Sequence, residues 1–141
     1  MTLFCDTSAL VKLVIEEPES EAVLRAANAA EWIAVCRITW AEAVAAMARR
    51  AREDPASADA IQQAREQLGQ LWPSLLIVEV SQPLVEAAGR YADAFALRGY
   101  DSVQLAAAHQ LQSAIEQPLT FACFDRRLNQ AAQLLQLQGL S

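Results

Sequence analysis

Short apolar runs alternate along the chain with longer amphipathic stretches. The apolar runs lie at residues 3–5, 32–36, 75–80 and 119–124, and they are apolar at nearly every position rather than at alternate ones. Continuous apolar runs of this length are typical of strands in a parallel sheet that is covered on both faces. The pattern therefore predicts four buried parallel strands.

The stretches between these runs have the spacing of helices. The predicted helices cover residues 8–14, 18–30, 40–53, 57–72, 81–98, 102–112 and 126–137. Ser57 and Ser81 are candidate N-caps, and Gly99 is expected at the C-terminal end of the helix that precedes it. Strands that alternate with helices predict an α/β protein. We expect one three-layer α/β/α domain over residues 1–141, with a mostly parallel central sheet.

The composition fits a globular domain with a substantial core. Hydrophobic residues make up 54% of the 141 residues, with only 4 Gly and 5 Pro, which argues against disorder. No apolar run reaches the roughly 18 residues that a membrane helix requires. The start of the chain lacks the basic region of a signal peptide, so we expect a cytoplasmic protein with no membrane partner.

The cysteines indicate a reducing environment. Cys5, Cys36 and Cys123 all lie inside predicted strands, and no two of them form a Cys-x-x-Cys pair. An odd number of cysteines fits no complete disulfide framework. We therefore expect three small core residues with free thiols and no structural zinc.

The net charge of the whole chain counts against a nucleic-acid partner. The formal net charge is −6, from 17 acidic and 11 basic residues, whereas phosphate contacts are usually made by a basic face. The charges are unevenly placed, however. Acids gather at residues 16–21, and bases cluster at 49–52 and 126–127. An RNA partner therefore stays open despite the net charge.

Four acids lie beside the ends of predicted elements. Asp6 directly follows the first strand and Asp125 the last, whereas Glu42 lies in the first turn of one helix and Asp101 just before another. In an open parallel sheet, the carboxyl ends of strands and the amino ends of the following helices share the edge where ligands bind. We expect Asp6 and Asp125 at that edge, with Glu42 and Asp101 within reach of it.

Each of these acids also has a purely structural explanation. Thr39-x-x-Glu42 and Asp101-x-x-Gln104 have the form of capping boxes, and the first and last acids could be ordinary N-caps. For a single acid, capping would be a sufficient explanation. Chemistry is favoured for the set because all four flank the same predicted edge and the chain offers no competing catalytic group.

Converging carboxylates imply a bound cation. Like charges in a cleft raise one another's pKa unless a cation neutralises them. Oxygen ligands without His or Cys suit Mg²⁺, with Mn²⁺ as an alternative. Such an ion can activate a water molecule and stabilise the charge that develops on a phosphate. The natural reaction is hydrolysis of a phosphodiester.

Four segments of the chain resemble motifs of PIN-domain toxins of the VapC type. The opening CDTSALVK at residues 5–12 resembles their D-T/S-S-A-L/V-x-K start. ITWAE at 38–42 resembles the second acidic motif, YDSVQLA at 100–106 the third, and TFACFDRRL at 120–128 the closing one. The order and spacing of the motifs match across nearly the whole chain.

The resemblance implies a PIN fold and a Mg²⁺- or Mn²⁺-dependent endoribonuclease, the toxin of a toxin–antitoxin pair. It also implies homodimers and a small antitoxin that covers the active edge. Thr7 or Ser8 takes the place of a hydroxyl that supports the first acid. The family's catalytic, metal-binding acids correspond to Asp6, Glu42, Asp101 and Asp125.

The chain departs from the family pattern at two positions beside these acids. Cys123 stands where the closing motif often has Thr or Ser, and Gln104 stands where many relatives have His. Both departures bear on metal affinity or rate more than on the type of chemistry.

Two other hypotheses come from different classes of protein. A catalytically silent PIN-fold module would use the fold for dimerisation and partner binding, with its acids as helix caps. Cys123 and the acidic net charge motivate this alternative. A phosphoaspartyl enzyme with Asp6 as nucleophile would need a second acid two residues on, where the chain has Ser8.

The sequence predicts the roles of the basic residues less specifically. Lys12 could approach an RNA phosphate, but a solvated lysine is favoured. Arg49, Arg50 and Arg52 are expected either on a solvated helix face or against an antitoxin. Arg126 and Arg127 directly follow the last acid of the cluster, so at least one of them could contact a substrate phosphate.

Overall fold

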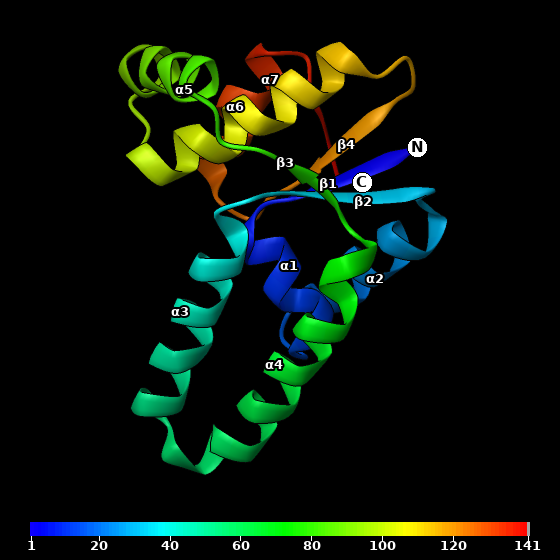
Figure 1. Ribbon diagram of the computed structural model, residues 1–141, viewed down its shortest axis with the longest axis vertical. Helices are drawn as coiled ribbons and strands as arrows, with labels where there is room; N and C mark the ends of the chain where they lie inside the picture. Colours follow the sequence, from blue (N-terminus) through cyan, green and yellow to red (C-terminus); the bar gives the residue numbers. More distant parts are fainter. Residues whose placement is uncertain (141) are drawn as a thin grey trace.

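A five-stranded parallel sheet forms the middle layer of the molecule (Figure 1). The computed structural model describes residues 1–140. The strand order is β3-β2-β1-β4-β5, and all four neighbouring pairs are parallel, as predicted. The strands are β1 (Thr2–Cys5), β2 (Trp32–Cys36), β3 (Leu76–Val78), β4 (Leu119–Ala122) and β5 (Gln138–Gly139).

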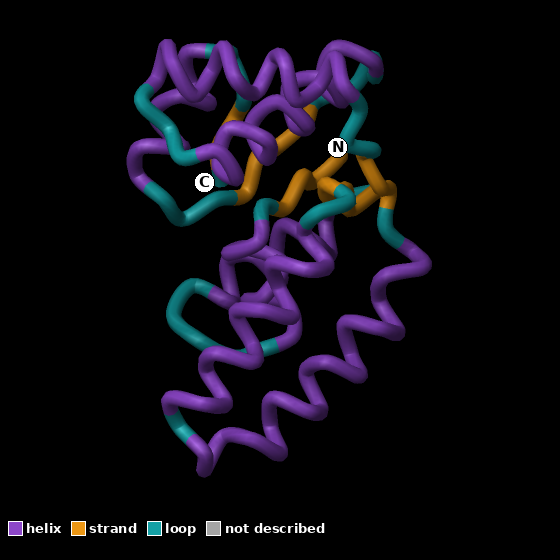
Figure 2. The backbone as a smooth tube through the Cα atoms, turned by 60° about the vertical axis from the view of Figure 1, so that its left-hand side comes forward, coloured by secondary structure: helices purple, strands orange, loops and turns teal. Residues whose placement is uncertain are grey.

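Helices cover both faces of this sheet. They are α1 (Thr7–Val14), α2 (Ser20–Ala29), α3 (Thr39–Glu53), α4 (Ala58–Leu71), α5 (Gln82–Phe95), α6 (Gly99–Ala114) and α7 (Arg126–Leu134), with 3-10 turns at Pro55–Ser57 and Trp72–Ser74. Helices α5, α6 and α7 lie on one face and α1 to α4 on the other, and the α3–α4 pair projects away from the sheet (Figures 1 and 2). The predicted three-layer α/β/α fold is confirmed. Within residues 1–140, no helix combines the length and apolar character needed to cross a membrane.

The core is divided by the sheet into two apolar clusters. Phe4 belongs to the cluster under α5, α6 and α7, where its ring stacks on that of Phe121 at 5.8 Å. Its neighbours Leu3 and Cys5 belong to the cluster on the opposite face, against α1, α3 and α4. Successive side chains of a strand point to opposite faces. Because both faces are covered, β1 is apolar at successive positions, which is why its sequence showed no alternation.

The cysteines contribute to these two clusters as predicted. Cys5, Cys36 and Cys123 are all buried, and none of them forms a disulfide within residues 1–140. Burial raises the pKa of each of the three thiols. A buried thiol with a raised pKa behaves as a small apolar side chain and not as a reactive group.

Two boundary predictions were wrong. Helix α5 ends at Phe95, where Ala96 takes the left-handed conformation with φ of 54° and its N–H bonds to the carbonyl of Ala92. Gly99 therefore does not end α5 but begins α6, so Asp101 lies inside the first turn of α6 instead of before it. The short strand β5 was also missed, because two exposed residues carry no hydrophobic pattern.

Candidate active site

One pocket at the carboxyl edge of the sheet brings together the four predicted acids. Strands β1 and β4 are parallel neighbours, and Asp6 and Asp125 follow their C-terminal ends. Helix α3 contributes Glu42 and helix α6 contributes Asp101. The pocket has a volume of about 470 Å³, and its lining includes all four carboxylates. All four acids therefore lie at the predicted edge of the sheet.

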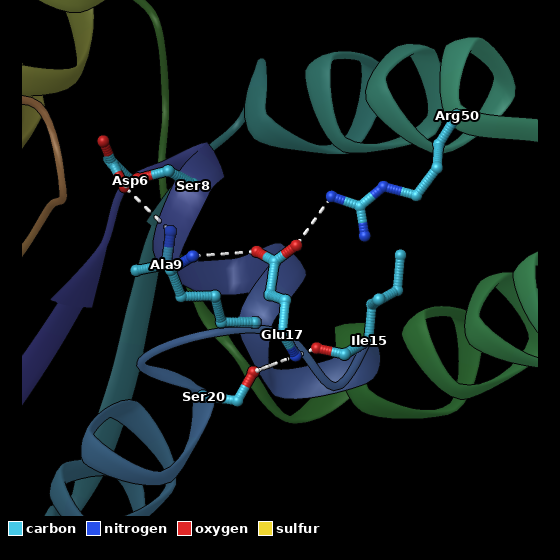
Figure 3. A network of polar contacts seen from close by, with 8 residues as sticks. Asp6, Ser8, Ala9, Ile15, Glu17, Ser20 and Arg50 are labelled. Atoms are coloured by element: carbon cyan, nitrogen blue, oxygen red, sulfur yellow. Dashed lines mark hydrogen bonds and ion pairs between the residues drawn. The ribbon is translucent and has the colours of Figure 1, made fainter. Parts of the chain in front are cut away.

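Asp6 is a buried helix cap as well as a pocket residue. Its Oδ1 accepts hydrogen bonds from Ser8 Oγ at 2.7 Å and from the backbone N–H of Ala9 at 3.0 Å (Figure 3). Burial raises the pKa of Asp6 and the charge of Asp101 adds to the rise, whereas hydrogen bonds from Ser8, Ala9 and Cys123 oppose it. Of the two hydroxyls that could support the first acid, Ser8 is the one that does so.

Asp125 has the same double placement. Its Oδ1 accepts from the backbone N–H of Leu128 at 2.8 Å, so it caps α7. The neighbouring Cys123 Sγ accepts from the backbone N–H of Asp125 at 3.3 Å. Capping and a place in the pocket are therefore compatible, because helix N-termini meet the sheet at this edge.

Glu42 does not take part in the predicted capping box. The N-cap of α3 is Ile38, which has no side-chain cap, and Glu42 instead accepts hydrogen bonds at its Oε1. Thr7 Oγ1 donates at 2.8 Å and Gln104 Nε2 donates at 2.8 Å. Residues from α1 and α6 therefore hold a carboxylate of α3 in place, a use that short-range sequence patterns do not reveal.

Gln104 likewise makes no capping box with Asp101. Its side chain is buried, and its Nε2 also lies 2.9 Å from Thr39 Oγ1 and 3.3 Å from Thr7 Oγ1. Its Oε1 is buried without a hydrogen-bond partner in residues 1–140. The amide nitrogen of Gln104 therefore contacts Glu42 and its neighbours, whereas the amide oxygen of the same side chain has no partner in residues 1–140.

The pKa of Asp101 is affected by the charges of the neighbouring acids. Burial raises the pKa of Asp101, and the charges of Asp125 and Glu42 raise it further, whereas Arg98 opposes the rise. None of the ion pairs formed within residues 1–140 includes any of the four pocket acids. The negative charge of these four acids is therefore left without a salt-bridge partner.

The donor set fits a hard divalent cation. All four candidate ligands offer carboxylate oxygens, which Mg²⁺ and Mn²⁺ prefer. In residues 1–140, no three Asp, Glu, His or Cys side chains are grouped closely enough to hold one ion. Like charges repel one another unless a cation neutralises them. Binding an ion therefore requires these side chains to draw together around it.

Glu17 and Arg50 also line this pocket, and together with Lys12 they form a network of charged residues that the sequence did not reveal. Glu17 Oε1 lies 2.9 Å from Lys12 Nζ, and Glu17 Oε2 lies 2.6 Å from Arg50 Nη2. Figure 3 shows Arg50 reaching from α3 toward Glu17. The Lys12 side chain is only 12% exposed and lies 4.8 Å from the ring centre of Phe124, so the expectation of a solvated lysine was wrong.

Arg126 and Arg127 do not line the acidic pocket. Arg126 lines a separate groove of about 730 Å³ beside α2 and α7. Arg127 Nη1 donates to the carbonyl of Ala96 at 3.2 Å. In the described part of the chain, Arg50 is the basic residue that lines this pocket, and Arg98 lies close enough to Asp101 to oppose the rise in the pKa of that carboxyl.

Three solved structures show the same fold. VapBC2 from Rickettsia felis, bound to a DNA fragment from its promoter, matches with a TM-score of 0.68 and 14% identity over 100% of each chain. FitAcB from Neisseria gonorrhoeae matches with a TM-score of 0.66 and 19% identity, over 99% of this chain and 96% of the other. VapC20 from Mycobacterium tuberculosis, a toxin that cleaves the sarcin-ricin loop, matches with a TM-score of 0.66 and 17% identity, over 92% and 94%.

Sequence comparison is more specific. The model of the PIN domain family matches residues 3–134. Ribonuclease VapC45 and ribonuclease VapC49, from two Mycobacterium tuberculosis strains, are each 31% identical over 131 residues, which cover 92% of this chain and 88% of each relative. The chain therefore belongs to the PIN-domain family and, within it, to the VapC-type ribonucleases.

Proposed function

We propose that the protein is an endoribonuclease that requires Mg²⁺ or Mn²⁺ and acts as the toxin of a toxin–antitoxin pair. The observation that carries the proposal is a single pocket lined by Asp6, Glu42, Asp101 and Asp125, none of which has a neutralising salt bridge within residues 1–140. The ribonuclease names of its relatives support the reaction class, and the toxin VapC20, which has a similar fold, supports the biological setting.

The four carboxylates are the residues that would hold the metal ion. A bound divalent cation supplies an activated water and stabilises negative charge on the phosphate. Ser8 and the backbone of Ala9 fix the orientation of Asp6, and Thr7 and Gln104 fix that of Glu42. These contacts keep the ligands oriented toward one pocket, so less rearrangement is needed when an ion binds.

The proposal includes the partners of the protein. The substrate is RNA, and a small antitoxin inhibits the enzyme by covering the acidic pocket. We also propose that the protein acts as a homodimer in the cytoplasm, a reducing compartment that suits its three free thiols.

A catalytically silent binding module is the second candidate. It is favoured by Asp6 and Asp125, because both carboxylates already cap the N-terminus of a helix. Glu42 and Asp101 argue against it, since neither caps a helix and yet both line the pocket. A module without chemistry has no need to collect charges that raise one another's pKa.

The test is cleavage of single-stranded RNA by the purified protein, in Mg²⁺ and after chelation. Asp6→Asn and Asp101→Asn should each lower the cleavage rate by orders of magnitude, and chelation should abolish cleavage. Asp59→Asn, at an exposed position of α4, makes the same chemical change away from the pocket and should leave the rate unchanged. Activity that survives chelation or either pocket substitution would contradict the proposal.

A further inference from the structure

Arg50 is the one basic side chain among the described residues that line the acidic pocket. Glu42, Ala46 and Arg50 lie four residues apart on α3 and all face this pocket. At about 1.5 Å of rise per residue, the backbone of Arg50 lies roughly 12 Å along the helix from that of Glu42. The pocket therefore runs along α3 from the acids to a single cation.

A largely buried carboxylate fixes the position of this cation. The Glu17 side chain is 15% exposed, and its Oε2 lies 2.6 Å from Arg50 Nη2. Lys12 Nζ donates to the other carboxylate oxygen, Oε1, of Glu17. The backbone N–H of Glu17 donates to Ser20 Oγ at 3.0 Å (Figure 3). Two cations share one carboxylate, so the cluster Lys12–Glu17–Arg50 carries one positive charge in excess.

The guanidinium of Arg50 keeps unused hydrogen-bonding capacity. A guanidinium has about five N–H donors, and within residues 1–140 the contact made by Arg50 is the single bond from Nη2 to Glu17. Its side chain is 43% exposed. A guanidinium that is held on one side and open on the other presents a preorganised fork for an anion such as a phosphate.

The negative charge of the pocket explains why a cation beside it would help RNA to bind. The four carboxylates repel a polyanion, and a metal ion offsets this only where it binds. An RNA strand that places one phosphate at the acids must run past them, and a cation along its path would hold a neighbouring phosphate. Arg50 lies on the pocket wall where it can make this contact.

We propose that Arg50 binds a backbone phosphate of the RNA next to the phosphate that is cleaved, with Glu17 as the positioning residue. This inference rests on the proposed ribonuclease function. It adds a phosphate-binding position that is separate from the carboxylates, so the two can be tested separately.

The experiment measures equilibrium binding of a short fluorescent single-stranded RNA to the full chain carrying Asp101→Asn, which prevents cleavage during the measurement. In this background, Arg50→Gln should weaken binding by about tenfold at low salt and lower the slope of log affinity against log salt by about one. Arg49→Gln is the matched control, because Arg49 lies one residue away, is 75% exposed, pairs with Glu53 and does not line the pocket. It removes the same charge and should bind as the parent does.

Two further variants separate a positioned contact from a general charge effect. Arg50→Lys keeps the charge and the pair with Glu17, so it should keep the salt slope and recover part of the affinity. Glu17→Gln adds a positive charge to the protein, so charge alone predicts tighter binding, whereas loss of positioning predicts weaker binding. Melting temperatures of all variants confirm that binding is measured on folded protein.

The outcomes distinguish this inference from the proposed function. RNA affinity and salt slope that are equal in Arg50→Gln and Arg49→Gln would overturn the role of Arg50 while leaving the ribonuclease proposal intact. Tighter binding by Glu17→Gln would overturn the positioning role of Glu17. No RNA binding by the Asp101→Asn parent would overturn the role of Arg50, whereas the cleavage assay tests the ribonuclease proposal by itself.

Discussion

Gln104 Nε2 lies 2.8 Å from Glu42 Oε1 and donates a hydrogen bond to it, which joins α6 to α3 between residues 62 positions apart. The Gln104 Oε1 atom is buried without a partner in the described part of the chain. A buried polar group without a hydrogen bond costs about 1–3 kcal/mol. Such costs are concentrated at functional sites, so the arrangement supports a role of Gln104 in orienting a pocket carboxylate.

Substitution of Gln104 tests this orienting role. Gln104→Ala removes a donor to Glu42 and should weaken Mn²⁺ affinity by about tenfold, as is typical for residues that orient metal ligands. Calorimetric titration with Mn²⁺ measures the change. Gln110→Ala, at an exposed position of the same helix, is the matched control and should bind Mn²⁺ as the wild type does. Equal affinities of the two variants would contradict the role of Gln104.

Asp101→Asn should stabilise the protein in the absence of metal. Burial and the charges of Asp125 and Glu42 raise the folded-state pKa of Asp101. A carboxyl whose pKa is raised on folding contributes stability at low pH and loses it as pH rises through the folded pKa. At pH 7 the ionised Asp101 therefore destabilises the metal-free fold, and the substitution should raise its melting temperature by a few degrees.

The same variant should respond differently to metal. Mg²⁺ should raise the melting temperature of the wild type, because a ligand that binds the folded state stabilises it, and should have little effect on Asp101→Asn. Asp59→Asn should behave as the wild type in both conditions. A wild type whose melting temperature does not respond to Mg²⁺ or Mn²⁺ would favour the silent binding module.

Glu17 should contribute stability that depends on pH. Burial opposes its ionisation, but hydrogen bonds and charges from Lys12 and Arg50 outweigh burial and lower the pKa of Glu17 below its usual range. Its contribution is therefore complete above the unfolded pKa and is lost as pH falls through the folded pKa. Glu17→Gln should lower the free energy of unfolding at pH 7 by about 1–3 kcal/mol, since it leaves Lys12 poorly paired.

Denaturant unfolding at a series of pH values measures this effect. The difference between the wild type and Glu17→Gln should shrink as the pH is lowered from 7 to below the folded pKa of Glu17. Glu53→Gln breaks the exposed pair with Arg49 and should cost at most about 0.5 kcal/mol. A Glu17→Gln effect as small as that of Glu53→Gln would show that the network adds no stability.

The three thiols should be unreactive in the folded protein. Cys5, Cys36 and Cys123 are buried, and burial raises the pKa of each thiol. The thiolate is the reactive form, so alkylation at pH 7.5 (about physiological) should be slow without denaturant and rapid for all three after unfolding. Rapid labelling of Cys123 in the native protein would show that its surroundings are more open than the structure indicates.

Much of the fold could be predicted from the sequence, because buried parallel strands leave continuous apolar runs. The order of strands and helices also placed Asp6 and Asp125 at the carboxyl edge. The end of α5 was predicted wrongly because Ala96, and not a glycine, adopts the left-handed conformation that ends the helix. Local residue preference favours glycine there, but the tertiary structure tolerates alanine.

The candidate site was less completely predictable. The capping boxes considered as alternatives at Glu42 and Asp101 do not form. A capping box depends only on neighbours in sequence, whereas Glu42 is held by Thr7 and Gln104 from other elements. The network of Glu17 with Arg50 joins residues 33 positions apart. Such contacts depend on how the helices pack, and no periodic pattern in the sequence records them.

The location of a bound Mn²⁺ ion tests the central claim most directly. Crystals of the wild-type protein grown with Mn²⁺ would reveal the ion by its anomalous scattering. We expect a peak in the acidic pocket, coordinated by carboxylate oxygens of Asp6 and Asp101 and of at least one of Glu42 and Asp125. A fully occupied ion elsewhere, or none in the pocket at saturating Mn²⁺, would contradict the assignment of these carboxylates as the metal site.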